Sequence, residues 1–315
     1  MAKPLWTRIS GDLIQARIPL PFPLRWVNSY LVKGAAGYTL IDPGLHTGQA
    51  LEAWRQIMAE VGCSFAEISA IVLTHHHPDH YGLAGWFQEQ TGAPVFMSET
   101  GMRQADLLWG EERPLTDAIE RLFLAHGMNA QLAEPLREHL ESFVPLVSPR
   151  PQATCIGKGE TIRIGNRNCL IMEHGGHAAG HLSFLDTATK EIFCGDQVLP
   201  QITPNISYIP GIDPDPLRTY LAGLRELSRL KAAVAYPGHR EPFAGIAHRA
   251  EEIIQHHEQR LLNISGFMKN GATAYEICLA MFGANLSLHQ LRFALSETIA
   301  HMIYLARGGD ETTTR

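Results

Sequence analysis

The segment THHHPDH at residues 74–80 gathers several metal-binding side chains within a few positions. The apolar run 70–73 directly precedes it and predicts a short buried strand, because it is rich in β-branched residues and bounded by polar ones. A loop of histidine and aspartate at the end of such a strand is a rigid place to build a metal site. Imidazole and carboxylate groups suit zinc, iron or manganese.

The spacing of these side chains indicates how they can share metals. In an extended stretch alternate residues lie on one face, so His75, His77 and Asp79 can point the same way. His80 points elsewhere unless the chain turns, and Pro78 favours a turn because it lacks a backbone donor. One metal can therefore bind His75 and His77, while a second can bind Asp79 and His80.

Two metals need more ligands than this segment offers, since a catalytic zinc takes about three protein ligands and keeps one position open. Three later strand-like runs border side chains of the required kind. They continue into EHGGHAAGH at 173–181, GD at 195–196 and PGH at 237–239. The glycines of the first segment let the backbone approach a bound group closely. We therefore expect these segments to complete the site.

Taken together, the motifs resemble those of the metallo-β-lactamase-fold hydrolases, of the type that includes glyoxalase II and β-lactamase-like protein 2. His-x-His-x-Asp-His stands at 75–80, Gly-His-x-x-Gly-His at 176–181, Gly-Asp at 195–196 and Gly-His at 238–239. Segments 28–32 and 40–44 are similar to the family's first strands. The resemblance covers about the first three-quarters of the chain. It implies an α/β fold, the four-layer αββα metallo-β-lactamase sandwich.

The resemblance also implies a dinuclear centre of two divalent metal ions, with zinc as the default and iron or manganese as alternatives. The implied ligands of the first metal are His75, His77 and His177. Those of the second are Asp79, His80 and His239, with Asp196 bridging the two metals.

Four further side chains of these motifs are expected to surround the ligands rather than to bind metal. Asp42 would orient ligands from behind, and His181 would lie beside them. His76 and His174 are spare imidazoles, expected to be solvated or to contact ligands. His174-Gly175 replaces the Thr-Pro that usually precedes the first Gly-His in the family, a change that keeps the ligand.

Such a site implies hydrolysis by a metal-bridging hydroxide, because two divalent metals lower the pKa of a shared water to about neutral and polarise a carbonyl. Asp79 is the expected catalytic residue, orienting the nucleophile and carrying its proton. The chain has no Gly-x-Ser-x-Gly motif that would favour a serine hydrolase.

The sequence constrains the substrate less than it constrains the fold and the metal site. Segment 197–205, which follows Asp196, is neutral and partly apolar, and this favours a carboxylic thioester or ester over a polyanion. Lactonases of the family are the first alternative, although they carry a tyrosine where this chain has Leu199; Tyr208 is a candidate substitute. A phosphodiesterase or ribonuclease is the second alternative, and a non-catalytic metal sensor is the least favoured.

The charge, apolar stretches and cysteines of the whole chain limit the class of protein. Its 315 residues carry a net charge of −6 without a block of like charges, which argues against nucleic acid and favours a small-molecule substrate. There is no apolar stretch of membrane-spanning length and no visible secretory signal. The five scattered cysteines, Cys194 among them, indicate reduced core thiols in a cytoplasmic protein. A homodimer is compatible with the helical tail.

Two domains are expected. Residues 1–244 would form the catalytic domain, with a helical insertion at about 101–145. The insertion would act as a lid or substrate wall, with a helical decoration that has no substrate role as the alternative. Residues 245–315 would form a small helical domain, with helices near 245–268, 273–281 and 288–306 and with winged-helix-like spacing. Thr273 and Glu276 predict a capping box for the second of these helices.

Overall fold

The computed structural model describes residues 3–309 and contains two β-sheets. The seven strands of the first lie in the order β1 (Trp6–Arg8), β2 (Leu13–Pro19), β3 (Trp26–Gly34), β4 (Gly37–Ile41), β5 (Ile68–Val72), β6 (Val95–Met97) and β7 (Ala153–Cys155). The five of the second lie in the order β12 (Val234–Pro237), β11 (Glu191–Gly195), β10 (His181–Asp186), β9 (Arg167–His174) and β8 (Thr161–Ile164).

Side chains that alternate along the strands build separate cores on the two faces of the first sheet. On β3, Tyr30 and Val32 pack between the two sheets, while Leu31 packs on the opposite face. On β2 the same division separates Leu13 from Ile14. Because both faces are covered, these strands read as nearly continuous apolar runs rather than as polar–apolar alternation.

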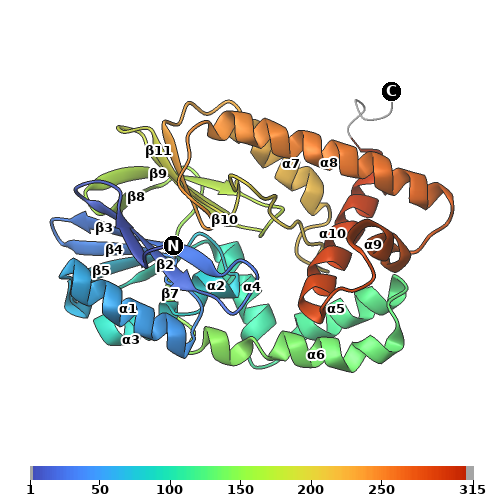
Figure 1. Cartoon of the computed structure of the whole chain (residues 1–315), viewed down its shortest axis with the longest axis horizontal. Helices are drawn as coiled ribbons and strands as arrows, with labels where there is room; N and C mark the ends of the chain where they lie inside the picture. The colour runs from blue at the N-terminus through green and yellow to red at the C-terminus, as the bar shows by residue number, and fades with distance from the viewer. Residues whose placement is uncertain (1–2, 310–315) are drawn as a thin grey trace.

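Helices cover the outer faces of both sheets (Figure 1). The helices α1 (Gly48–Val61) and α3 (Ala84–Thr91) pack on the first sheet through Trp54 and Phe87, whose rings meet edge to face. The helices α7 (Pro216–Leu227) and α8 (Ile246–Lys269) pack on the second sheet. The predicted four-layer αββα arrangement is therefore confirmed.

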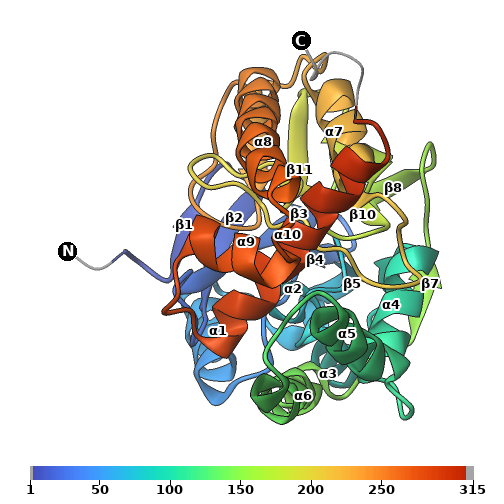
Figure 2. The ribbon, with the colours of Figure 1, turned by 90° about the vertical axis from the view of Figure 1, so that its right-hand side faces the viewer.

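The helical insertion and the helical tail meet in one shared core. Insertion helices α5 (Pro114–Ala125) and α6 (Ala133–Glu141) lie beside tail helices α9 (Ala274–Phe282) and α10 (Leu288–Ala306) (Figure 2). The remaining insertion helix, α4 (Glu99–Trp109), packs against α5. Leucines and other apolar residues of α5, α6, α9 and α10 form a single buried cluster. Thr273 and Glu276 form the predicted capping box at the start of α9. Within described residues 245–309 the tail contains no strand, so its likeness to a winged helix is confined to the helices.

The strand ends that carry the predicted motifs converge at one edge of the sandwich. Strands β4 and β5 run parallel and end at Asp42 and at the 74–80 segment, within which α2 (Pro78–Tyr81) forms a single turn. Strands β11 and β12 also run parallel, ending at Asp196 and His239. The turn between β9 and β10 brings His177 to the same edge. The described chain also contains short 3-10 helices at Phe65–Glu67, Ala130–Leu132 and Val144–Val147.

No described helix combines the length and the apolar character that crossing a bilayer requires.

Candidate metal centre

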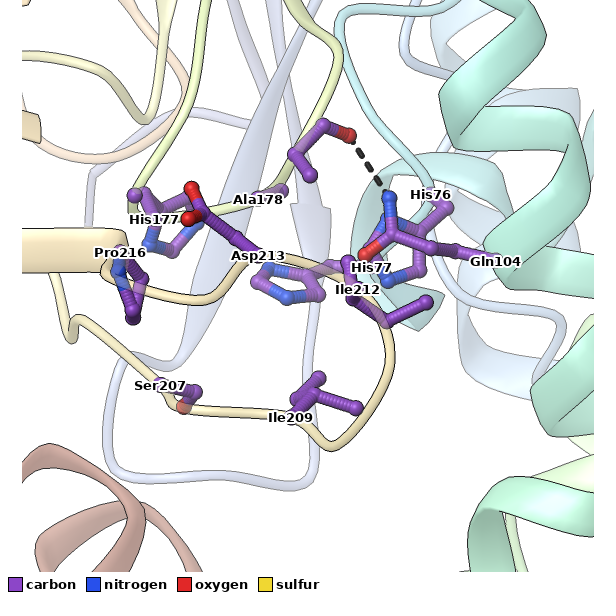
Figure 3. Close-up of a pocket in the computed structure, with 12 residues that line it drawn as sticks. His76, His77, Gln104, His177, Ala178, Ser207, Ile209, Ile212, Asp213 and Pro216 are labelled. Atoms are coloured by element: carbon purple, nitrogen blue, oxygen red, sulfur yellow. Dashed lines mark hydrogen bonds between the residues drawn. The ribbon is translucent and has the colours of Figure 1, made fainter. Parts of the chain in front are cut away.

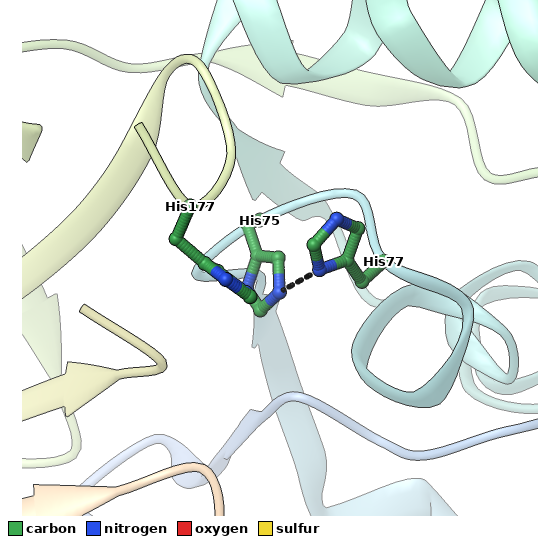
Figure 4. A group of neighbouring side chains, drawn as sticks. All are labelled: His75, His77 and His177. Carbon is green, nitrogen blue, oxygen red and sulfur yellow. Dashed lines mark hydrogen bonds between the residues drawn. The ribbon is translucent and has the colours of Figure 1, made fainter. Parts of the chain in front are cut away.

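Three imidazoles form one half of the site (Figure 4). His75 and His77 come from the loop after β5, and His177 comes from the turn between β9 and β10. The facing ring nitrogens of His75 and His77 are 3.0 Å apart, and the nearest nitrogens of all three residues lie within 4.8 Å of one another. This convergence suits three nitrogen ligands around one ion.

Asp79, His80 and His239 form the other half. The Nε2 atom of His239 lies 3.2 Å from Asp79 Oδ2, and that of His80 lies 3.9 Å from the same oxygen. Ligand atoms of the three residues also fall within 4.8 Å of one another. One carboxylate and two imidazoles are a ligand set that zinc, iron and manganese accept.

Asp196 lies between the two halves. Its Oδ2 atom is 3.4 Å from His239 Nε2, 3.5 Å from His80 Nε2 and 3.7 Å from His177 Nε2. One oxygen thus faces imidazoles of both groups. The structure therefore brings together all seven side chains that the sequence predicts as ligands.

Backbone and side-chain oxygens hold the far ring nitrogens of three of these histidines. Nδ1 of His177 lies 2.8 Å from the carbonyl oxygen of Asn205, and Nδ1 of His239 lies 3.0 Å from that of Trp26. Nδ1 of His80 lies 2.8 Å from Asp42 Oδ2. Each contact fixes the ring orientation and leaves Nε2 as the nitrogen that is free to bind a metal.

Asp42 organises the loop as well as His80. Its carboxylate accepts hydrogen bonds from the backbone N–H and the hydroxyl of Thr74, at 2.8 and 2.6 Å. Its φ is 50°, in the left-handed region that aspartate tolerates better than most residues. Such strained positions cost about 1–3 kcal/mol and gather at functional sites. The expected orienting position of Asp42 behind the ligands is what the structure shows.

Close packing holds Asp196 from two sides. The backbone N–H of Asp196 donates to His181 Nε2 at 3.1 Å, so His181 lies beside the ligands as expected. A Cβ added to Gly238 would lie 2.2 Å from Asp196 Oδ1 and 2.5 Å from His80 Cε1. The family-like Gly-His pair therefore needs a glycine for space beside the carboxylate.

The two groups of histidines differ in protonation. Burial lowers the pKa of His75 and His77 well below its usual range and lowers that of His177, so these rings are neutral. Burial opposes the charge of His239 too, but Asp196 and Asp79 outweigh it and raise the pKa to about 10. Neutral imidazole is the form that binds metal, so a metal at the second group would have to displace a proton.

Unpartnered buried atoms test whether these residues fit divalent cations. His177 Nε2 and Asp196 Oδ1 are both inaccessible, and neither has a hydrogen-bond partner among the described residues. Buried polar atoms normally have partners, and orphaned ones point to a missing ion or water. Because these atoms belong to the converging ligand set, the residues fit a pair of divalent metal ions.

His76 and His174 were expected to be solvated or to contact ligands, and both are buried. The ring of His76 lies 5.9 Å from that of Trp109 and 5.0 Å from that of the ligand candidate His77, so only the solvated alternative is wrong for it. His174 lies against Gly223 on α7 and makes a 3.9 Å contact with Glu226. Long-range packing, which the local motif does not encode, sets both positions.

The expectation for Cys194 was correct, because this thiol is fully buried. It donates to the carbonyl oxygens of Val198 and Tyr236, at 3.4 and 3.5 Å. Burial raises its pKa, so the thiol stays protonated and does not act as a nucleophile.

Five of the seven predicted ligands, all except His75 and His80, line a cavity of about 400 Å³. Leu108, Trp109, Ile119, Leu140 and Phe143 line it from the insertion and the turn after it, and His289, Arg292 and Phe293 line it from α10. A smaller pocket of about 20 Å³ adjoins it at His77 and His177, where Gln104 donates to the carbonyl oxygen of Ala179 at 2.7 Å (Figure 3). The contribution of α10 to this wall was not predicted, since no local motif marks it.

Comparison with known proteins agrees with this site. The Metallo-beta-lactamase superfamily matches residues 24–239, and the "Metallo-beta-lactamase-like, C-terminal domain" family matches residues 262–314. The chain therefore belongs to the metallo-β-lactamase superfamily, as its motifs predicted, and within it to metal-binding hydrolases.

Three similar proteins illustrate the match. A "probable metallo-hydrolase" of Bacillus subtilis is 29% identical, over 92% of this chain and 91% of its own length. An "atrochrysone carboxyl ACP thioesterase" of Aspergillus fumigatus is 24% identical, over 84% and 71% respectively. The crystal structure of a metallo-beta-lactamase family protein from Thermus thermophilus has a TM-score of 0.85 and 34% identity, covering 95% of each chain.

Proposed function

We propose that this protein hydrolyses a carboxylic thioester or ester with the help of two divalent metal ions, most simply zinc. One observation carries the proposal: five of the seven predicted metal ligands line a large cavity whose walls are otherwise mainly apolar. Cavities of a few hundred Å³ with apolar walls and few polar groups are typical of small-molecule sites.

The cavity walls suit an acyl chain better than a polyanion. Leucine, isoleucine, phenylalanine and tryptophan side chains predominate where the insertion lines the cavity, and α10 adds Phe293 among polar residues. Among the described residues that line the cavity, Arg292 is the one lysine or arginine. A nucleic-acid backbone would need several cations, so a phosphodiesterase or ribonuclease is disfavoured. The printed description of the Aspergillus fumigatus relative as a carrier-protein thioesterase also supports thioester hydrolysis.

The ligand assignment forms part of the proposal. His75, His77 and His177 would hold the first ion, Asp79, His80 and His239 the second, and Asp196 would bridge them. The ions would supply Lewis acidity toward the substrate carbonyl and would acidify the attacking water. Asn205, Trp26 and Asp42 would keep the ligand rings oriented through the contacts to their Nδ1 atoms.

Asp79 is the proposed proton carrier. It lines the cavity, and its side chain is 18% exposed, so it can reach substrate and water. Burial opposes ionisation of this carboxyl, but His80 and His239 outweigh burial and lower its pKa. Asp79 is therefore an ionised base at neutral pH that can accept a proton from water and return it to the leaving group.

A lactonase is the weaker alternative in this cavity. Leu199 lines the cavity at the position where lactonases of the family carry tyrosine. Tyr208 packs against apolar clusters instead, and it is absent from the described residues that line the cavity. A tyrosine hydroxyl is therefore not placed to hold a lactone here.

Initial rates of the zinc-loaded protein would test the proposal. We would compare a medium-chain acyl-CoA thioester, a homoserine lactone and bis-p-nitrophenyl phosphate, with Asp79→Ala as the control variant. We expect thioester turnover that the variant loses by several orders of magnitude, since it lacks both a ligand and the proton carrier. Turnover of the phosphodiester alone would refute the proposal.

A further inference from the structure

An arginine without an ionic partner projects into the cavity from α10. Arg292 lines the cavity, and its guanidinium makes no hydrogen bond or ion pair with any described residue. Its Nε atom is inaccessible and unpartnered. The guanidinium instead lies 4.2 Å from the ring centroid of Phe293 and 5.5 Å from that of Phe143.

Three other largely buried arginines of this protein are neutralised, whereas the Nε atom of Arg240 is inaccessible and unpartnered as that of Arg292 is. Arg17 pairs with Glu241, Arg167 with Asp12 and Glu191, and Arg260 with Glu297. A buried charge without a partner is costly, so structural arginines normally contact a carboxylate. Arg292 differs from Arg240 because it lines the cavity, where a ligand would lie.

The cavity offers no carboxylate that could serve Arg292. Asp79 and Asp196 are the carboxylates among its described lining residues, and both belong to the proposed metal ligands. Burial lowers the pKa of Arg292 to about 10, a shift that Asp79 partly opposes, so the guanidinium is still charged at pH 7. A charged fork that packs against two aromatic rings has its donors preoriented for an anion from the substrate.

We propose that Arg292 binds a carboxylate at the far end of the acyl group, so that the substrate is an ω-carboxyacyl thioester or ester. The inference rests on the proposed function and specifies its substrate class. A carboxylate fits better than a phosphate, because one planar guanidinium pairs with it bidentately and no second lysine or arginine lines the described cavity.

The acyl side is favoured over the leaving group by size. A cavity of about 400 Å³ accommodates a small acyl chain, whereas a carrier protein is too large to enter it. With a carrier-protein thioester, only the acyl group and the arm that carries it could therefore enter. The inaccessible Nε places the Arg292 head within the wall rather than on the outer surface. The apolar walls would contact the methylene chain between the two carboxyl functions.

A matched pair of substrates tests the inference with zinc-loaded protein. We would use N-acetylcysteamine thioesters of adipic acid and of its mono-amide, which differ in charge but hardly in shape. The wild type should prefer the carboxylate by about 30-fold in kcat/KM, as expected for a charge-assisted pair. Arg292→Met should reduce that preference to about 3-fold or less, mainly through KM. Arg292→Lys should retain part of it, because lysine keeps the charge without the fork.

Binding of the products gives a second readout that needs no turnover. Adipate should bind the wild type more tightly than its mono-amide in calorimetry, and Arg292→Met should remove the difference. Arg307→Met is the matched control, since Arg307 ends the same helix on the exposed surface. That variant should keep the wild-type preference in both assays.

The outcomes separate the two proposals. Turnover of both thioesters at equal rates by the wild type would overturn the assignment of Arg292 and leave thioester hydrolysis standing. A preference that survives in Arg292→Met would overturn it as well. Failure to hydrolyse either thioester, with adipate still bound more tightly by the wild type than by Arg292→Met, would refute thioester hydrolysis and support the carboxylate site.

Discussion

Replacing Asp42 by asparagine should separate the orientation of a ligand from the ligand itself. The Asp42 carboxylate accepts three hydrogen bonds, from the N–H of Thr74 to Oδ1 and from the Thr74 hydroxyl and His80 Nδ1 to Oδ2. Asparagine has one acceptor oxygen, so at least one bond is lost whichever way the amide points. Asparagine tolerates a φ of 50° as aspartate does, so the backbone preference is unchanged.

The expected magnitude follows from these contacts. Hydrogen bonds to a charged acceptor contribute about 1.5–3 kcal/mol each, and those that remain weaken when the acceptor becomes neutral. We expect Asp42→Asn to lower the free energy of unfolding of the metal-free protein by about 3 kcal/mol. Because His80 loses its fixed orientation, affinity for the second metal should fall by about 10–100-fold.

Urea unfolding and competition with a zinc chelator measure the two effects. Asp186→Asn is the control, since Asp186 is also buried and accepts from Ala188 N–H and the Thr189 hydroxyl, both at 2.9 Å. It lies five residues along β10 from His181, about 16 Å away. The control should lose stability and keep wild-type metal affinity. An Asp42→Asn variant with wild-type affinity for both metals would refute the reasoning.

Three further outcomes are expected. Gly238→Ala should keep its far-UV circular dichroism but lose most of its bound metal, because the new Cβ would lie 2.2 Å from Asp196 Oδ1; full metal content in elemental analysis would contradict this. Asp196 and Asp79 outweigh the effect of burial and raise the pKa of His239 to about 10. In the metal-free protein this ring is therefore protonated at pH 7.5. Metal uptake should then release protons, and affinity should rise with pH up to about 10; calorimetry in two buffers that reports no proton release would count against it. Burial lowers the pKa of His174 to about 4 and that of His301 to about 3. Below pH 6.5 the unfolded chain takes up protons that the folded chain excludes, so each should lower the stability of the metal-free protein by about 2 kcal/mol at pH 5. His174→Gln or His301→Gln should therefore lose about 2 kcal/mol less stability than the wild type between pH 7.5 and pH 5, and equal losses would rule this out.

Strong local signals made much of the fold predictable. Thr273 and Glu276 fixed the start of α9, and α10 spans 288–306 as its apolar periodicity predicted. Strands β1 and β7 were not predicted, because each has three residues and is defined by pairing with a neighbouring strand. Such short edge strands have no periodicity of their own.

The candidate site shows the same limit. The seven predicted ligands lie at strand ends, and the topology brings those ends together. Arg292 and Phe293 reach the same cavity from a helix more than 200 residues after the first motif. Their position depends on the packing of α10 against α5 and α6, a contact between segments far apart in the chain. The sequence of α10 contains few cationic residues, and no local pattern indicates that Arg292 faces the cavity.

The shared core of the insertion and the tail has a consequence for how substrate preference can change in this lineage. Much of the wall facing the proposed substrate is encoded in two stretches of the gene, near residues 101–145 and 274–306, whose side chains interlock; residues 22–24 and 199–209 contribute the other part outside the metal-binding loops. If only one stretch were replaced by that of a relative, its apolar face would no longer match the other stretch. Transfer of a relative's substrate preference to this protein should therefore require both stretches from that same relative. Natural recombinants that divide the pair should be rare, and compensating changes should occur in both stretches together.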